Sequence, residues 1–95
     1  DMFMCDAWRE AIDRELERTG LRNLVFDVSG VSFIDSSGLG VILGRYRKLT
    51  ARGGKVAVHG ANKQVYKILL LSGLAKIMEV LPADTKAGNR VGGLL

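Results

Sequence analysis

Residues 33–45 read FIDSSGLGVILGR and join the end of a predicted strand region to the start of a strongly patterned helix. The helix is expected from about Ser37 to Ala51, because apolar residues recur three and four positions apart along it. That apolar stripe consists of Leu39, Ile42, Leu43, Tyr46 and Leu49. Upstream, Leu24–Val28 (LVFDV) is short and rich in β-branched and aromatic residues, which is typical of a strand. The centre of the predicted fold is therefore a strand, a polar junction and a helix.

The segments on both sides of this unit continue the alternation of helices and strands. We expect helices at 3–18 and 63–71 and short strands at 55–59 (KVAVH) and 77–80. Gly20 suits the left-handed position that ends the first helix. The alternation predicts an α/β fold, a mostly parallel sheet covered by helices with right-handed connections. We expect one domain over residues 1–82 and a poorly ordered tail over 83–95, which is small, polar and without periodicity.

The composition indicates a soluble globular protein rather than a membrane or secreted one. The 95 residues are 47% hydrophobic, and no apolar run approaches the roughly 18 residues that cross a bilayer. Cys5 is the only cysteine, so no internal disulfide can form, and we expect a cytoplasmic protein. The formal charge of +4 includes a basic cluster in which Arg45, Lys48 and Arg52 recur at helical spacing. This spacing favours a solvated helix face over a nucleic-acid surface.

The polar junction is the candidate functional site. Sites in open α/β sheets lie beyond the carboxyl ends of strands, and Asp35, Ser36 and Ser37 follow such an end. Gly38 and Gly40 carry no side chains, so another molecule can approach the hydroxyl groups. The alternative is structural: Asp35 or Ser36 only caps the helix, while Gly40 and Gly44 pack closely against the sheet. Each helical glycine costs about 1 kcal/mol relative to alanine, so either close packing or access must offset it.

The junction resembles the signature of anti-sigma factor antagonists, the small STAS-domain proteins, and most closely the sporulation type that controls sigma F. The similarity continues through residues 45–80, RYRKLTARGGKVAVHGANKQVYKILLLSGLAKIMEV. It includes the double glycine before a strand and the LSGL turn after the third helix. From Phe3 to Val80 the order of the family's segments is kept.

This resemblance implies a regulatory binding protein without catalytic activity or cofactor. In the family, the unmodified antagonist binds an anti-sigma factor that is also a serine kinase, and the sigma factor is released. The kinase phosphorylates the serine directly after the motif aspartate, and a serine phosphatase removes the phosphate. By motif position the phosphorylated residue is Ser36, and the partner-binding residues are Asp1, Asp35, Ser36, Ser37, Gly38, Leu39 and Gly40.

The sequence departs from the family at its start, because the family's first two strands are absent from this chain. Three short strands then carry the sheet, and an apolar edge is expected to be exposed. Two other functions stay open: a STAS module of a stress-response or sensory assembly, and a small nucleotide-binding domain that uses the 35–40 segment.

Three single residues are expected to have structural roles. Trp8 lies on the apolar stripe of the first helix and is expected in the core. Cys5 is expected to be inert. His59, the only histidine, has no cysteine or carboxylate at ligand spacing, so no metal site is expected.

Overall fold

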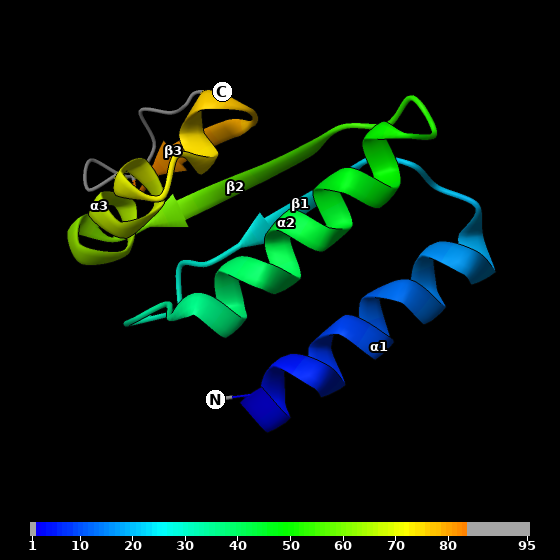
Figure 1. Cartoon of the computed structure of the whole chain (residues 1–95), viewed down its shortest axis with the longest axis horizontal. Helices are drawn as coiled ribbons and strands as arrows, with labels where there is room; N and C mark the ends of the chain where they lie inside the picture. The colour runs from blue at the N-terminus through cyan, green and yellow to red at the C-terminus, as the bar shows by residue number, and fades with distance from the viewer. Residues whose placement is uncertain (1, 84–95) are drawn as a thin grey trace.

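The chain folds into helices and parallel strands in the predicted order. A computed structural model describes residues 2–83, with side chains described from Cys5 onward. Asp1 and residues 84–95, which include nearly all of the predicted tail, lie outside the described residues, so the division of the chain at Pro82 stays a prediction. The elements are α1 (Met2–Thr19), β1 (Leu24–Asp27), α2 (Ser36–Thr50), β2 (Val56–Ala61), α3 (Lys63–Leu71), the 3₁₀ turn η1 (Leu74–Lys76) and β3 (Glu79–Pro82) (Figure 1).

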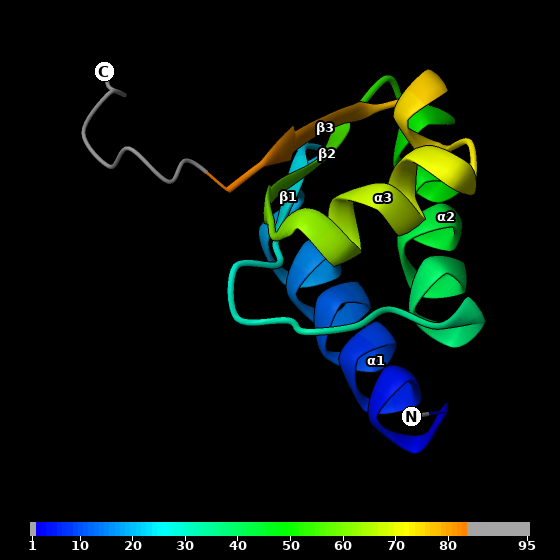
Figure 2. The ribbon, with the colours of Figure 1, turned by 90° about the vertical axis from the view of Figure 1, so that its left-hand side faces the viewer.

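The sheet has three parallel strands in the order β1-β2-β3. Phe26, Val58 and Val80 stand side by side across the strands and face the helices. All three α-helices lie on this side of the sheet (Figure 2). For α2 and α3, which connect neighbouring parallel strands, right-handed connections in one direction along the sheet require this. The core therefore lies between the sheet and the helices, and its largest fully buried side chains are Leu49, Leu69, Val58 and Val65.

The other face of the sheet carries no helix within the part of the chain that the structure describes. Val25 on the edge strand β1 is 54% exposed, and Leu81 on β3 is 44% exposed. These exposed apolar side chains lie on the open face of the sheet, and the exposure of an apolar edge stays a prediction. No helix among residues 2–83 has the length and hydropathy needed to span a membrane.

Helix α1 runs alongside α2 and contacts it directly (Figures 1 and 2). It ends as predicted, because Gly20 adopts φ +70° and its amide donates to the carbonyl of Leu16. The prediction of a solvated Arg45 is wrong: this residue is only 8% exposed. Its Nε lies 3.1 Å from Asp13 Oδ1 on α1, and Lys48 Nζ lies 3.5 Å from Asp13 Oδ2. Packing of α1 over this side of α2 removes Arg45 from water, and the ion pair compensates its charge.

The prediction that Trp8 lies in the core is wrong, because this residue is 49% exposed. The apolar side chains of α1 that contact the core lie further along the helix: Leu16 is buried in the core cluster, and Ile12 packs against it. Trp8 lies nearer the start of the helix, at the rim of a hollow described below. Its spacing correctly places it on the inner face of α1, but that face is only partly covered there.

The last strand lies two residues later than predicted, at Glu79–Pro82 instead of 77–80. Gly73 adopts φ +88° and η1 follows it, so the chain is still turning at Ile77. The amides of Ile77 and Met78 both donate to the carbonyl of Leu74, which keeps them out of the sheet. Pro82 ends β3, an edge strand, where its missing amide donor is tolerated.

Candidate functional site

Asp35 is the residue that caps α2. Its backbone is extended, with φ −103° and ψ −173°, and its Oδ1 accepts a hydrogen bond from the amide of Gly38 at 3.1 Å. The amide of Leu39 donates to the Asp35 carbonyl at 3.0 Å and begins the helical ladder. Of the two residues that the sequence offered as caps, Asp35 takes this role, and the Ser36 hydroxyl is not needed for it.

Ser36 is the first residue of α2, and it is exposed. Ser37, one position later, is half-buried. Amides of the first helical turn have no acceptor within the helix, so the backbone beside Ser36 presents free N–H groups and the positive end of the helix dipole. The geometry thus provides an accessible hydroxyl in a locally positive setting.

A buried and a half-buried neighbour hold this exposed end of α2 against the core. Ile34, directly before Asp35, is only 8% exposed and belongs to the core cluster. Leu39 is half-buried and packs against the same cluster. The site residues between them are therefore fixed from both sides by apolar contacts.

The glycines of α2 differ in what surrounds them. A Cβ on Gly38 would lie 3.1 Å from Ile34 Cγ2, so Gly38 allows close packing. A Cβ on Gly40 or Gly44 would meet nothing within 4 Å. The alternative that Gly40 and Gly44 pack closely against the sheet is therefore wrong. Gly40 is exposed, and its missing side chain leaves this part of the surface open.

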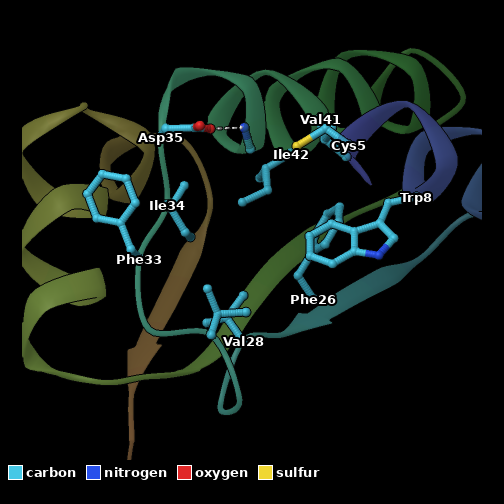
Figure 3. A pocket seen from close by; sticks show the side chains of 11 residues that line it. Cys5, Trp8, Phe26, Val28, Phe33, Ile34, Asp35, Val41 and Ile42 are labelled. Atoms are coloured by element: carbon cyan, nitrogen blue, oxygen red, sulfur yellow. Dashed lines mark hydrogen bonds between the residues drawn. The ribbon is translucent and has the colours of Figure 1, made fainter. Parts of the chain in front are cut away.

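A mostly apolar hollow of about 160 Å³ opens beside the cap (Figure 3). It lies between α1, the end of β1 and the first turns of α2, and Asp35 and Gly38 form part of its wall. Its lining also includes Trp8 and Phe33, and Phe33 is 60% exposed. Sequence reasoning missed this hollow, because its walls come from three separate segments and no local pattern brings them together.

Charged groups of the open sheet face lie in neighbouring strands. The backbone amide of Ser29 donates to Asp27 Oδ1 at 3.0 Å, and hydrogen bonds from the Ser29 side chain and backbone hold the pKa of Asp27 below its ordinary value. His59 Nε2 lies 2.7 Å from Glu79 Oε1. Among the residues that the structure describes, no three metal-binding side chains gather closely enough to hold an ion.

The structure brings the predicted site residues together at one end of the molecule. Six of the seven, from Asp35 to Gly40, form the cap and first turn of α2. Asp1, the seventh, lies outside the described residues. The absence of the family's first two strands stays a prediction.

Comparison with known proteins decides the family. A model described as STAS domain matches residues 1–87. The chain belongs to the STAS domain family. The resemblance stated from the sequence and the predicted α/β fold are thereby confirmed.

Relatives of this STAS domain carry the names of sigma-factor regulators. An anti-sigma F factor antagonist of Paenibacillus polymyxa is 38% identical over 87 residues, which cover 92% of this chain and 74% of the relative. An anti-sigma-B factor antagonist of Listeria monocytogenes is 28% identical over 80 residues, covering 84% and 69%. The crystal structure of a candidate anti-sigma factor antagonist of Thermotoga maritima has a TM-score of 0.78 and 25% identity, covering 92% of this chain and 74% of that one.

The cap of α2 can be tested separately from its charge. Asp35→Ala is expected to lower the free energy of unfolding by about 1 kcal/mol, because the Gly38 amide loses its acceptor. Asp35→Asn keeps a side-chain oxygen that accepts this bond, so its stability is expected to stay within a few tenths of 1 kcal/mol of the parent. Urea unfolding measures both variants. Equal destabilisation by the two substitutions would show that charge, and not capping, is what Asp35 contributes.

Proposed function

We propose that this STAS domain is an anti-sigma factor antagonist controlled by phosphorylation of Ser36. The unmodified protein binds an anti-sigma factor that is also a serine kinase, and the sigma factor is released. The kinase transfers the γ-phosphoryl group of ATP to Ser36 Oγ; ADP leaves, and a base of the kinase takes the hydroxyl proton. The phosphorylated protein no longer binds, until a serine phosphatase hydrolyses the phosphate ester.

The observation that carries this proposal is the position of Ser36. Its side chain is exposed on the first residue of α2, while Asp35 performs the capping. The hydroxyl is therefore available to another protein without any loss of structure. Two relatives, from Paenibacillus polymyxa and Listeria monocytogenes, are named as anti-sigma factor antagonists, and these names support the choice of partner.

The local electrostatics support a switch in recognition over a switch in folding. A phosphoserine carries about −1.5 to −2 charges at pH 7. At the start of a helix these charges face free backbone N–H groups and the positive end of the dipole, which favour them. Phosphate on Ser36 adds bulk and charge beside the Asp35 carboxylate, so it changes the surface presented to the partner.

The proposal is tested by mixing the protein with candidate anti-sigma factor kinases and ATP and mapping phosphate by mass spectrometry. Phosphate on Ser36 is the expected result, together with loss of the complex on a sizing column. Phosphate on Ser37 alone would overturn the site assignment. Absence of any complex with every kinase of this class would overturn the function.

One alternative within the family has a specific observation in its favour. The Listeria monocytogenes relative is named for sigma B, so a STAS module of a stress-response or sensory assembly would use the same serine with a different kinase. Parallel binding assays with kinases of the sporulation and stress-response classes distinguish the two. We favour the sporulation class, because the Paenibacillus polymyxa relative has the higher identity of the two.

A nucleotide-binding function is less well supported by the fold of the same segment. Residues 36–40 form the first turn of α2 rather than a free loop that could wrap phosphate groups. Incubation of the protein with ATP alone is expected to leave the ATP intact. Turnover of ATP without a kinase would instead favour a nucleotide-hydrolysing function.

Gly40 offers a test in which stability and binding change in opposite directions. Gly40→Ala is expected to raise the free energy of unfolding by about 0.5–1 kcal/mol, because alanine is the better helix former and the site is open. It is also expected to weaken binding of the anti-sigma factor severalfold, since the new methyl group lies on the contact surface.

The matched control is Gly44→Ala, one helical turn further from Ser36. A Cβ there also meets nothing within 4 Å, so the same gain in stability is expected with unchanged affinity. Calorimetric titration and urea unfolding measure the two quantities. Equal affinity of the Gly40→Ala variant and the parent would remove Gly40 from the contact surface.

A further inference from the structure

The loop that carries the candidate site is fastened to the neighbouring β2–α3 turn. This loop, residues 28–35, connects β1 to α2. At its start, the Val28 amide donates to the His59 carbonyl at 2.9 Å, and the Val31 amide donates to the Val28 carbonyl at 2.9 Å. Further along, Asn62 Nδ2 donates to the Val31 carbonyl at 3.2 Å. The loop thus takes part of its shape from a segment about 30 positions away in sequence.

Asn62 uses the two ends of its side-chain amide for different tasks. Its Oδ1 accepts a hydrogen bond from the Val65 amide at 2.8 Å and caps α3. Its Nδ2 makes the bond to the Val31 carbonyl. An aspartate can perform the first task but not the second, because a carboxylate has no hydrogen to donate.

Gly60, near the end of β2, lies close to the start of this loop. It adopts φ +86°, and a Cβ at this position would lie 3.1 Å from Ser29 Cβ and 3.2 Å from Asp27 Oδ1. A side chain here would crowd these two atoms and would require a strained left-handed backbone, which glycine adopts freely. The end of β2 therefore lies directly against the start of the loop, and Asn62 follows directly after this strand.

The hydrogen bond from Asn62 to the Val31 carbonyl acts on a part of the loop with few other restraints. Ser32 and Phe33, which follow Val31, are both exposed. The next buried residue is Ile34, directly before the cap of α2. Between Val28 and Ile34, Val31 is held by its partial packing against the core and by the bond from Asn62.

We propose that Asn62 is a positioning residue for Ser36: through the Val31 carbonyl it holds the loop that presents the hydroxyl to the kinase. The proposal rests on the function proposed above, because it concerns the phosphorylation of the same serine. Asn62 acts through the loop and the cap and makes no contact with the transferred phosphoryl group. Its contribution is to the fraction of time that the hydroxyl spends in a reactive position.

The test uses Asn62→Asp and Asn62→Ser with the full chain. Both replacements are good helix caps, so α3 keeps its cap, and the thermal midpoint is expected within about 5 °C of the parent. Aspartate lacks the donor, and serine lacks the reach without adding charge. We expect kcat/KM for phosphorylation of Ser36 to fall about three- to tenfold in both, as loss of one such bond implies.

The matched control is Asn23→Asp. Asn23 is another exposed asparagine that joins two segments, but its Oδ1 accepts from the Lys55 amide at 2.9 Å, a bond that aspartate keeps. Phosphorylation of this variant is expected within twofold of the parent. Hydrogen exchange provides the readout that a purely structural role would not give: amides 31–38 are expected to exchange faster in the Asn62 variants, with the core unchanged.

The possible outcomes separate this inference from the proposed function. Unchanged phosphorylation and unchanged exchange in both Asn62 variants would overturn the role of Asn62 alone. Faster exchange throughout the domain would assign Asn62 to general stability and also overturn it. A parent protein that takes no phosphate on Ser36 would overturn the proposed function, while exchange would still show whether Asn62 holds the loop.

Discussion

Ser36→Asp is expected to lower the affinity for the anti-sigma factor at least tenfold and to leave the free energy of unfolding within about 1 kcal/mol of the parent. The residue is exposed at the start of α2, where a negative charge interacts favourably with the helix N-terminus. The same charge beside Asp35 disturbs the surface that binds the partner. Calorimetric titration and urea unfolding give the two numbers.

Two further variants make this test specific to the position. Ser36→Ala is expected to bind like the parent and to take no phosphate, so it stays active in the presence of ATP. Ser37→Ala, at the half-buried neighbour, is expected to accept phosphate on Ser36 as before. A Ser36→Asp variant that binds as tightly as the parent would contradict the mechanism.

Gly54→Ala is expected to be the most destabilising single substitution proposed here, with a loss of about 3 kcal/mol. A Cβ at Gly54 would lie 1.9 Å from the Arg22 carbonyl oxygen and 2.8 Å from the Arg22 carbonyl carbon. These are backbone atoms, so no change of rotamer can relieve the clash. For a domain of this size the loss corresponds to a fall of roughly 15 °C in the midpoint of thermal unfolding.

Its control is the adjacent glycine. Gly53 adopts φ +80° with nothing within 4 Å of a Cβ, so Gly53→Ala meets only the cost of a left-handed backbone, about 1 kcal/mol. Urea unfolding of both variants gives the comparison. A smaller loss for Gly54→Ala than for Gly53→Ala would show that the backbone of Arg22 moves away freely.

The sequence predicted those features that depend on local spacing and residue type. The stripe containing Ile42 and Leu49 gave α2 to within one residue at each end, and both side chains are buried. The short polar residues at 35–37 indicated the start of the helix, because such side chains satisfy its free amides. Both signals lie within one short, continuous segment of the chain, where a pattern can be recognised directly.

The features that the sequence did not predict depend on contacts between distant segments. Arg45 was placed in solvent by its charge, yet the passage of α1 over α2 buries it against Asp13. The double glycine at 53–54 was noted only as part of the family resemblance, and the close approach of Gly54 to the Arg22 backbone was missed. The hollow beside Asp35 was missed for the same reason, since helix α1 supplies Trp8 to it.

The separation between Ser36, at the surface, and the apolar residues that support α2 from below has an evolutionary consequence. Substitutions that repack Leu49, deep in the core, are expected to alter heat tolerance and to leave the first turn of α2, the proposed contact surface, in place. Under the proposed function, substitutions of exposed residues on that turn that make no capping bond are expected to retune binding while the core stays packed. A lineage carrying this domain can therefore adapt to a new temperature and to a new regulatory partner by two independent routes.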